Sequence, residues 1–387
     1  MKRILIFSLS YFPHIGGAEI AMKEITDRIA HKDIEFHMIT LRFGNEPSRE
    51  TVGNIIVHRI GDGSSYLGKV FFIPRAARVA ARLHRADPFD AFWAMMSYMV
   101  FPIVLLRLRG IRPPYLLSLQ EGDPFKHVFN RSYILPFRSL LHSGFKNASA
   151  VQAISSFLAG WAKQEGFQGT PDVIPNGVDV RLFSRPIDKE KRYLFRASIM
   201  DPNGTLLVTT SRLVKKNAVD VVIRALVLLP ASVKFLIIGS GPDERELKNL
   251  AQRLRIESRI EFIGYKNNAS LPFYLHSSDI FIRPSRSEGM GNSFIEAMAI
   301  GIPIIGTQEG GIRDFLCDAR RDPGKETTGW AVDPDSPEQI AEAVQDILAH
   351  PDKTAQVTLV AKKLVSEKYD WNSIAMNMQI LFEKICN

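Results

Sequence analysis

The sequence has little cysteine, no long apolar run and no low-complexity tract. Its two cysteines, Cys317 and Cys386, are too few for a disulfide framework or a cysteine-based metal site, and they fit a reducing, cytoplasmic setting. No run approaches the ~20 apolar residues that a membrane-spanning helix needs. The opening MKRILIFSLS has a short apolar part without a small-residue cleavage site after it, so we expect a buried strand there rather than a signal peptide.

The net charge of +8 is spread unevenly along the 387 residues. Residues 1 to 180 carry 21 Lys and Arg against 15 Asp and Glu, which favours an anionic partner for this half. Two basic segments contribute, 129–146 and a helix-like stretch that places four arginines on one side: Arg75, Arg78, Arg82 and Arg85. An anionic membrane surface is therefore a candidate partner, and an ordinary solvated helix face is the alternative. No nucleic-acid motif is present, so we expect no nucleic-acid partner.

Strand-like apolar runs alternate with helix-like periodic segments, which predicts an α/β protein with parallel sheets covered by helices. We expect helices near 17–31 and 217–229 and after Met290. The expected strands are 3–9, 36–40, 55–60, 89–95, 115–119, 150–155, 205–211, 234–239, 260–265, 279–285 and 302–307. The pattern runs through the first half and restarts near residue 205. It therefore predicts two successive Rossmann-like units.

Prolines, glycines and dense charge interrupt the periodicity over residues 173–204, where we place the interdomain linker. We expect an N-terminal domain over 1–180 and a C-terminal domain over 200–370. A last helix at about 371–387 is expected to pack back on the N-terminal domain. Two such domains facing each other would form a cleft at the carboxyl ends of their strands, which is where open α/β sheets bind ligands.

The segment PSRSEGMGNSFIEAMAIG, residues 284–301, places Glu288 and Glu296 on either side of a glycine-rich turn. We read it as the end of a strand, a turn and the start of a helix. Backbone N–H groups at that helix start would form an anion site, and Gly289 and Gly291 would let a phosphate approach closely. The alternative is a capping box in which Ser293 caps the helix and Glu296 reaches back to the cap amide. Capping leaves Glu288, the two glycines and Asn292 unexplained.

This segment resembles the E-x7-E signature of glycosyltransferase family 4, whose retaining enzymes have the GT-B fold of two Rossmann-like domains facing across a cleft. The resemblance covers nearly the whole chain. Further similar segments follow in the family's order: YFPHIGGAEI (11–20), VIPNGVDVRLF (173–183), SRLVKKNAVDVVIRAL (211–226), FLIIGSGPDEREL (235–247), IEFIGY (260–265), GTQEGGIRDF (306–315) and YDWNSIA (369–375).

The resemblance implies a UDP-sugar or GDP-sugar donor, held without a metal ion or cofactor. Glu296 would hold the ribose hydroxyls, since a carboxylate can accept two hydrogen bonds. Glu288 would contact the sugar being transferred. The diphosphate would lie on the backbone amides of Gly289, Met290, Gly291, Asn292 and Ser293.

The same resemblance implies that Arg212 and a nearby lysine neutralise the leaving phosphate, in place of a divalent metal. The common form R-L-V-x-x-K-G is broken here, because Asn217 and Ala218 stand where lysine and glycine usually fall. Lys216 is our preferred substitute, and Lys215 stays as an alternative. Both lysines could equally be solvated charges at a helix start.

Two features of the N-terminal half complete the expected site. Gly16 and Gly17 open a helix after the first strand, so they would form a second amide site for the donor phosphates, unless they serve only a tight turn. Many family members carry a histidine after the strand that here reads PYLLSL, and Gln120 occupies that position. Glu121 and Asp123 offer carboxylates that would orient an acceptor hydroxyl or offset positive charge building at the anomeric carbon. The alternative is a solvated glutamate and a turn residue.

The sequence therefore predicts a retaining glycosyltransferase with a glycan or lipid-linked acceptor, acting in cell-surface polysaccharide or glycolipid biosynthesis. We expect it in the cytoplasm or on the cytoplasmic face of a membrane. The first alternative is a non-catalytic nucleotide-sugar-binding or scaffold protein, because Gln120 and Asn217 could mark lost activity. A nicotinamide-dependent oxidoreductase is disfavoured, because GSGPDERE (239–246) lacks the third glycine of the dinucleotide fingerprint.

Overall fold

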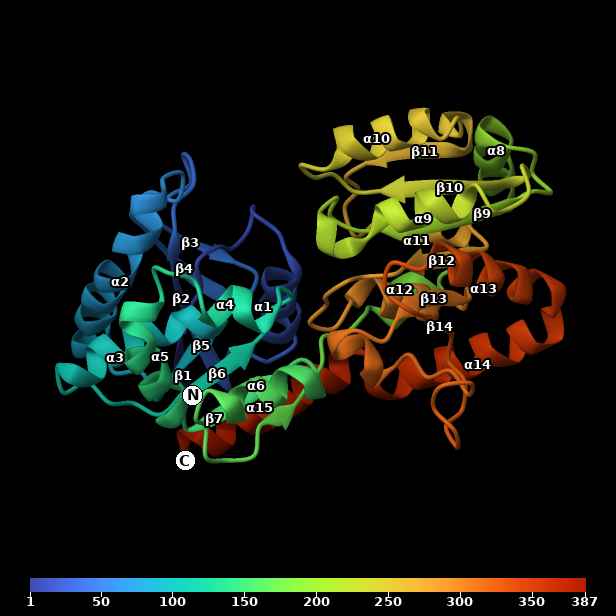
Figure 1. Ribbon diagram of the computed structural model, residues 1–387. Coiled ribbons are helices and arrows are strands. Elements are labelled where there is room, and N and C mark those ends of the chain that lie inside the picture. Colours follow the sequence, from blue (N-terminus) through green and yellow to red (C-terminus); the bar gives the residue numbers. More distant parts are fainter. The chain divides into compact units, whose positions relative to one another are not determined.

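Two parallel sheets organise the chain, which the computed structural model describes over all residues 1–387. Unit 1 comprises Met1–Asn176 and Trp371–Asn387, and unit 2 comprises Gly177–Asp370. Helices cover the sheet in each unit (Figure 1). The predicted α/β class with two parallel-sheet domains is confirmed. No helix in the chain combines the length and the apolar character that crossing a membrane would require.

Unit 1 contains an eight-stranded sheet in the order β3-β4-β2-β1-β5-β6-β7-β8, in which only β3 runs antiparallel to its neighbour. Apolar side chains of β1, β2 and β5 pack on α1 and the last helix, α15, where Trp93 meets Phe382 with ring centroids 4.9 Å apart. The strands are β1 (Lys2–Phe7), β2 (Ile34–Leu41), β3 (Arg49–Val52), β4 (Ile55–Ile60), β5 (Ala91–Met95), β6 (Tyr115–Leu119), β7 (Ala150–Ala153) and β8 (Asp172–Val173).

The helices of unit 1 include a group of three, α2, α3 and α5, that lie side by side in Figure 1. Helix α15 follows the chain's return from unit 2, and its buried face from Trp371 to Ile385 joins the core of unit 1. The α-helices are α1 (Gly17–Asp27), α2 (Tyr66–Ala86), α3 (Val100–Leu108), α4 (Phe125–Phe129), α5 (Arg138–Lys146), α6 (Ser156–Gln164) and α15 (Trp371–Cys386), with 3₁₀ turns η1 (Ser97–Met99) and η2 (Leu135–Phe137).

Unit 2 contains a six-stranded, all-parallel sheet in the order β11-β10-β9-β12-β13-β14. Strands β12, β13 and β14 are buried on both faces, as is typical of parallel sheets, whereas the edge strand β11 is mostly only partly buried. The strands are β9 (Thr205–Thr210), β10 (Val233–Ile238), β11 (Ile260–Gly264), β12 (Ile280–Arg283), β13 (Ile304–Thr307) and β14 (Trp330–Val332).

Helices α9, α10 and α13 pack on one face of this sheet, and α12 contacts α7, α11 and α14 elsewhere in the unit. The α-helices of unit 2 are α7 (Val180–Ser184), α8 (Lys189–Ile199), α9 (Val219–Leu226), α10 (Glu244–Arg253), α11 (Leu271–His276), α12 (Asn292–Ile300), α13 (Pro337–Ala349) and α14 (Pro351–Lys368), with 3₁₀ turns η3 (Lys215–Asn217), η4 (Glu257–Arg259) and η5 (Gly310–Asp314).

The segment 173–204, expected to be a linker, differs from that expectation. From Gly177 onward it belongs to unit 2 and forms α7 and α8. Asp179 and Asp188 cap these helices with their side chains. Arg196 anchors α8 to the unit by donating to Asp279 and to the backbone oxygens of Ser277 and Gly204. The dense charge in this segment therefore supplies helix caps and a partly buried ion pair.

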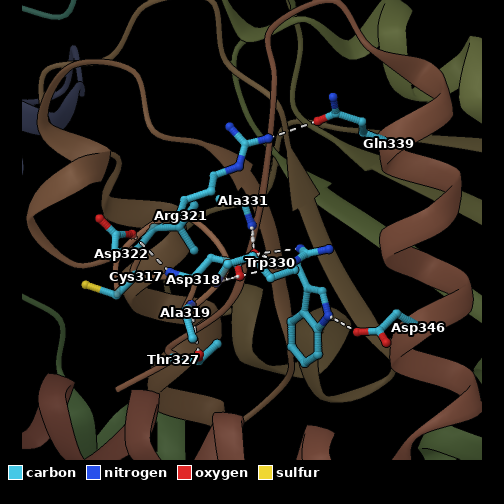
Figure 2. A network of polar contacts seen from close by, with 12 residues as sticks. Cys317, Asp318, Ala319, Arg321, Asp322, Thr327, Trp330, Ala331, Gln339 and Asp346 are labelled. Atoms are coloured by element: carbon cyan, nitrogen blue, oxygen red, sulfur yellow. Dashed lines mark hydrogen bonds and ion pairs between the residues drawn. The ribbon is translucent and has the colours of Figure 1, made fainter. Parts of the chain in front are cut away.

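The loop between η5 and β14, residues 315–329, is stabilised by a network of polar contacts around Asp318 (Figure 2). The Asp318 carboxylate accepts from the Arg320 guanidinium and, at 2.9 Å, from the backbone N–H of Ala331. Burial opposes ionisation of Asp318, but these hydrogen bonds outweigh it and lower its pKa. Trp330 donates to Asp346 at 2.6 Å on the far side of the same segment. The network fixes the segment that follows η5.

Candidate functional site

The glycine-rich segment 284–301 lies at the carboxyl end of β12, in the middle of the unit 2 sheet. Strand β12 ends at Arg283, a turn follows, and α12 begins at Asn292 after Gly291. Gly291 has φ of +96°, and a Cβ there would come within 2.9 Å of the Phe294 ring. Glycine is therefore required at this position. The Phe294 amide of the first turn donates to Gly291 O at 3.0 Å. The amides before it lie at the helix start, where no intrahelical acceptor is available, so this turn has the chemistry of an anion site.

The capping-box alternative for Ser293 and Glu296 is wrong. The cap residue is Gly291, which makes no side-chain cap hydrogen bond, and Ser293 lies inside the first turn of α12. Its hydroxyl instead accepts from Nη1 of Arg283 at 2.7 Å. The physical reason is the left-handed backbone at Gly291, which starts the helix two residues earlier than a Ser293 cap would.

Glu288 is held from both sides of the turn. Its backbone oxygen accepts from Gly311 N at 3.1 Å, and Gly310, with φ of +60°, could not carry a Cβ because that atom would lie 1.9 Å from the same oxygen. Its carboxylate accepts from Gly289 N at 3.1 Å and forms an ion pair with Arg283. One of the amides expected to hold the diphosphate thus already has an acceptor in its neighbour.

Glu296 lies on α12, and its side chain is partly buried. Burial raises its pKa to about 8, although the positive charge of Arg283 opposes that shift. Burial also lowers the pKa of Arg283 to about 10, with Glu296 opposing it. A single guanidinium, that of Arg283, therefore pairs with the Glu288 carboxylate and acts through its charge on the Glu296 carboxyl group.

The turn η3 brings Arg212 and the lysines to this segment. The backbone oxygen of Lys216 accepts from Arg286 N at 2.7 Å, and Asn217 donates to the backbone oxygen of Arg212 at 2.6 Å. Ala218, the next residue, is buried with φ of +54° and ψ of +35°, a left-handed conformation that favours glycine. The conformation agrees with the family register, in which glycine usually stands here.

The expected amide site of unit 1 has a carboxylate beside it. Gly16 is the cap of α1 and Gly17 its first residue, without a side-chain cap. Glu19, in the first turn, accepts from the Ser10 hydroxyl at 2.5 Å, and a Cβ on Gly16 would lie 2.7 Å from its other oxygen. The negative charge offsets part of the positive helix dipole here.

A pocket of about 220 Å³ opens at the carboxyl end of the unit 1 sheet and is lined by both expected acceptor-side carboxylates. Glu121 is buried and accepts from Ser97 N and Ser97 Oγ, both at 2.6 Å, and from Gln120 N at 2.9 Å. Burial raises its pKa. Asp123 is about half exposed and lies 3.7 Å from Arg131. The hydrogen bonds of Glu121 thus stabilise the backbone beside the pocket, whereas Asp123 is accessible to solvent.

Met96 forms another part of this wall and has φ of +71°, unusual for a residue with a side chain. Such backbone strain concentrates at functional sites. Gln120, at the position where a histidine is common, accepts from Asn176 Nδ2 at 3.0 Å. The Gln120 side chain therefore connects the end of β6 to Asn176, the residue at which the chain leaves unit 1.

The structure brings the expected donor residues of unit 2 together around one turn. In unit 1, Glu121 and Asp123 line one pocket, whereas Gly16 and Gly17 are not among its lining residues. Sequence reasoning missed two residues at the first of these places: Arg283, because FIRPS was read only as a strand, and Arg286, which follows that run and was given no role. Arginine at the end of a strand that is otherwise wholly apolar was the available signal, since buried arginines are rare unless paired.

Comparison with known proteins follows the same division of the chain. Residues 15–182 match the family model "Glycosyltransferase Family 4", and residues 191–364 match "Glycosyl transferases group 1". An uncharacterized glycosyltransferase of Methanocaldococcus jannaschii is 22% identical over 387 residues, covering 100% of this chain and 99% of that protein. A GDP-mannose-dependent alpha-(1-6)-phosphatidylinositol monomannoside mannosyltransferase of Mycolicibacterium smegmatis is 27% identical over 64% of this chain and 65% of its own length.

Solved structures show the same fold. Sucrose-phosphate synthase from Thermosynechococcus elongatus superimposes with a TM-score of 0.84 at 19% identity, covering 100% of this chain and 99% of that one. Anabaena HepE, in a complex with UDP and glucose, gives 0.79 at 19% identity over 99% and 100% of the two chains. The fold is GT-B, as the resemblance implied. With both halves matched by the family models, the chain belongs to glycosyltransferase family 4 and transfers a sugar from a nucleotide-sugar donor.

Proposed function

We propose that this enzyme is a retaining glycosyltransferase that moves a sugar from a UDP-sugar or GDP-sugar to a hydroxyl of a glycan or lipid-linked acceptor. We place it in the biosynthesis of cell-surface polysaccharide or glycolipid. The observation that carries the proposal is the turn between β12 and α12, where Glu288 and Glu296 flank an anion-favouring helix start. HepE was solved with UDP and glucose, and the mycobacterial relative is GDP-mannose-dependent, so both bases are candidates.

The donor residues take separate parts of one ligand in this proposal. Glu296 accepts from the ribose hydroxyls, the amides of 290–293 face the diphosphate, and Glu288 contacts the sugar. Arg212 and Lys216 offset the charge that develops on the departing phosphate. The bond from the anomeric carbon to the phosphate oxygen breaks, the acceptor oxygen bonds to that carbon on the same face, and the acceptor proton passes to the departing oxygen.

On the acceptor side, we assign Asp123 to orient the hydroxyl and Glu121 to hold the pocket in shape. One oxygen of Glu121 accepts from the backbone N–H and the hydroxyl of Ser97, and the other accepts from the backbone N–H of Gln120. Asp123 remains accessible beside Arg131 at the rim of the same pocket. An accessible carboxylate can approach an acceptor hydroxyl, whereas a buried and fully bonded one cannot.

Thermal-shift screening against UDP-, GDP- and ADP-sugars identifies the donor, because a ligand that binds only the folded state raises the melting temperature. Transfer or hydrolysis of that donor is then measured for the wild type, Glu288→Ala and Glu296→Ala. We expect both variants to lose at least ~100-fold in kcat/KM. Donor binding without turnover in the wild type would favour a non-catalytic nucleotide-sugar-binding protein. A glycosyl adduct trapped on a carboxylate would contradict the same-face mechanism.

We also propose that unit 1 docks on an anionic membrane surface through α2, α3 and the segment around α5. The stretches 63–86, 97–119 and 124–149 contain 12 Lys and Arg and no Asp or Glu. Tyr66 on α2 contacts Tyr133, and Phe101 on α3 contacts Phe137, so the stretches adjoin. Eight large apolar side chains are exposed on them: Tyr66, Leu67, Val70, Phe71, Leu108, Tyr133, Leu135 and Phe137. Apolar side chains flanked by cations suit the interface of an anionic bilayer.

Sedimentation with vesicles tests this docking surface. We expect binding to vesicles that contain phosphatidylglycerol and little binding to pure phosphatidylcholine. Arg78→Glu and Phe71→Ser should each weaken the partition coefficient by roughly tenfold. Arg253→Glu, an exposed charge reversal on α10 of unit 2, is the matched control. Equal binding by Arg78→Glu and Arg253→Glu would exclude the surface.

A further inference from the structure

Arg283 is a buried cation at the end of β12. Its side chain is 10% exposed, and Glu288 beside it is 12% exposed. A buried guanidinium carries a large desolvation cost unless its N–H groups and its charge are satisfied. The strand would be more stable with an aliphatic residue at this position if packing were the only requirement. The partners of Arg283 therefore indicate what the charge does.

The guanidinium joins four parts of the donor turn. Its Nε donates to Ser285 Oγ at 3.1 Å and its Nη1 to Ser293 Oγ at 2.7 Å. Its Nη2 pairs with the Glu288 carboxylate and lies 3.5 Å from Asn217 Oδ1. The strand end, the first turn of α12, the sugar-side glutamate and η3 are thus fixed to one planar group, which a flexible lysine could not replace.

The charge of Arg283 solves an electrostatic problem of this turn. A diphosphate must approach Glu288 and the ionised form of Glu296, and these carboxylates would repel it if they were uncompensated. Arg283 pairs with the first, and its charge favours ionisation of the second, against the effect of burial. Arg212 is exposed, and the side chain of Asn217 contributes an amide at the place where the family usually has a cation. Arg283 is the buried cation on this side of the turn.

We propose that Arg283 is a positioning residue for the donor: it holds Glu288 toward the sugar and offsets the negative charge of the two glutamates so that a diphosphate can enter. Nothing in the family comparison assigns it this role. The inference rests on the proposed donor site. It assigns the role of the buried cation at that site to Arg283 at the end of β12 rather than to a residue of η3.

The test measures donor affinity against pH for the wild type, Arg283→Gln and Arg283→Lys. Calorimetric titrations with UDP-glucose and with GDP-mannose run from pH 6 to pH 9. For the donor that binds, we expect Arg283→Gln to weaken Kd by roughly tenfold or more. We also expect the pH at which affinity changes to move upward, because Glu296 loses its neighbouring cation. Arg283→Lys should keep the wild-type transition and bind several-fold more weakly, because it keeps the charge and loses the fork.

Arg196→Gln is the matched control, because Arg196 is also a buried, ion-paired arginine of unit 2 but has no contact with the donor turn. It should lower the melting temperature and leave the pH transition in place. An Arg283→Gln variant that keeps both the wild-type Kd and the wild-type pH transition overturns the proposal. If Arg283→Gln does not fold, an Arg283→Lys variant that loses the pH transition overturns it instead. Failure of the wild type to bind any nucleotide-sugar overturns the proposed function as well, which distinguishes the two results.

Discussion

Arg286 donates two parallel hydrogen bonds to Asp220, from Nη1 to Oδ1 at 3.0 Å and from Nη2 to Oδ2 at 2.8 Å. The same guanidinium donates to Asp335 at 2.7 Å, and the Arg286 backbone N–H donates to Lys216 O. The hydrogen bonds to Asp220 are the largest cause of a raised Arg286 pKa. The start of α9 and the loop before α13 are thereby tied to the donor turn.

We expect Arg286→Met to release Asp220 of α9 and the Lys215 backbone oxygen of η3 from the donor turn, because both accept hydrogen bonds from the Arg286 guanidinium. The pair is about one-third exposed, so its loss should cost only about 1 kcal/mol of stability because water screens it. The kcat/KM should fall roughly tenfold or more, since misplacing a positioned group is costly to catalysis. Asp335→Asn, which leaves the Asp220 pair intact, is the control and should retain most of the activity. Comparable losses in both variants would contradict a specific role for the Asp220 pair.

Glu296 predicts a pH dependence of donor binding. Burial holds its pKa at about 8, so at neutral pH the carboxyl is mostly protonated before the donor binds. The ionised form accepts hydrogen bonds from both ribose hydroxyls, whereas the protonated form has lost part of that capacity. Donor affinity should therefore rise as the pH increases toward 8. Titration calorimetry measures this, and Glu296→Gln should show weaker, nearly pH-independent binding. An equal pH slope in Glu296→Gln would place the titrating group elsewhere.

Apolar periodicity predicted most of the two sheets. The segments 55–60 and 115–119 match β4 and β6 residue for residue, because β6 is wholly buried and β4 is buried at alternate residues, and both burial patterns show in the sequence. Three short strands were missed: β3 reads RETV on an exposed edge, β8 has two residues, and β14 follows a long excursion. β8 and β14 pair with β7 and β13, which lie far from them in the sequence, and local pattern does not contain such contacts. β3 forms a local hairpin with β4 and was missed because it is mostly polar and only partly buried.

The site was predictable in its residues and much less so in its contacts. The turn of Glu288 and Glu296 could be read from glycine spacing, but Ser293 could not be assigned, because its role depends on where Gly291 starts the helix. Arg283 contacts Ser293 from ten residues away and Asn217 from 66 residues away. Only the parallel order β9-β12 brings those residues together.

Ala218 predicts an unusual mutational pattern in η3. Its left-handed backbone costs about 1 to 2 kcal/mol for a residue with a Cβ, and glycine removes that cost. Glycine also loses a buried methyl group, worth about 0.8 kcal/mol, and gains freedom in the unfolded chain. We therefore expect Ala218→Gly to change stability by less than about 1 kcal/mol. Ala218→Val should destabilise by about 2 kcal/mol or more, because a branched Cβ worsens the clash. Thermal melts of both variants decide this, and equal effects would contradict the assigned backbone strain.

His58 and His37 predict acid sensitivity in unit 1. The two rings stack, with His37 Nδ1 and His58 Nε2 3.1 Å apart. Burial, the neighbouring His37 and the cations Arg49 and Arg82 lower the pKa of His58 to about 4, and burial lowers that of His37 although Glu35 opposes the shift.

A histidine with a lowered pKa stays neutral in the folded state while the unfolded chain takes up the proton near pH 6.5, so stability falls as the pH drops from about 6.5 toward 4. The loss from His58 is at most about 3 kcal/mol. Urea unfolding across this range should show His58→Gln with a shallower decline than the wild type. His31→Gln, at an exposed position in the same unit, is the control and should follow the wild type. The same decline in all three proteins would mean that carboxylates, rather than the histidine pair, set the acid limit.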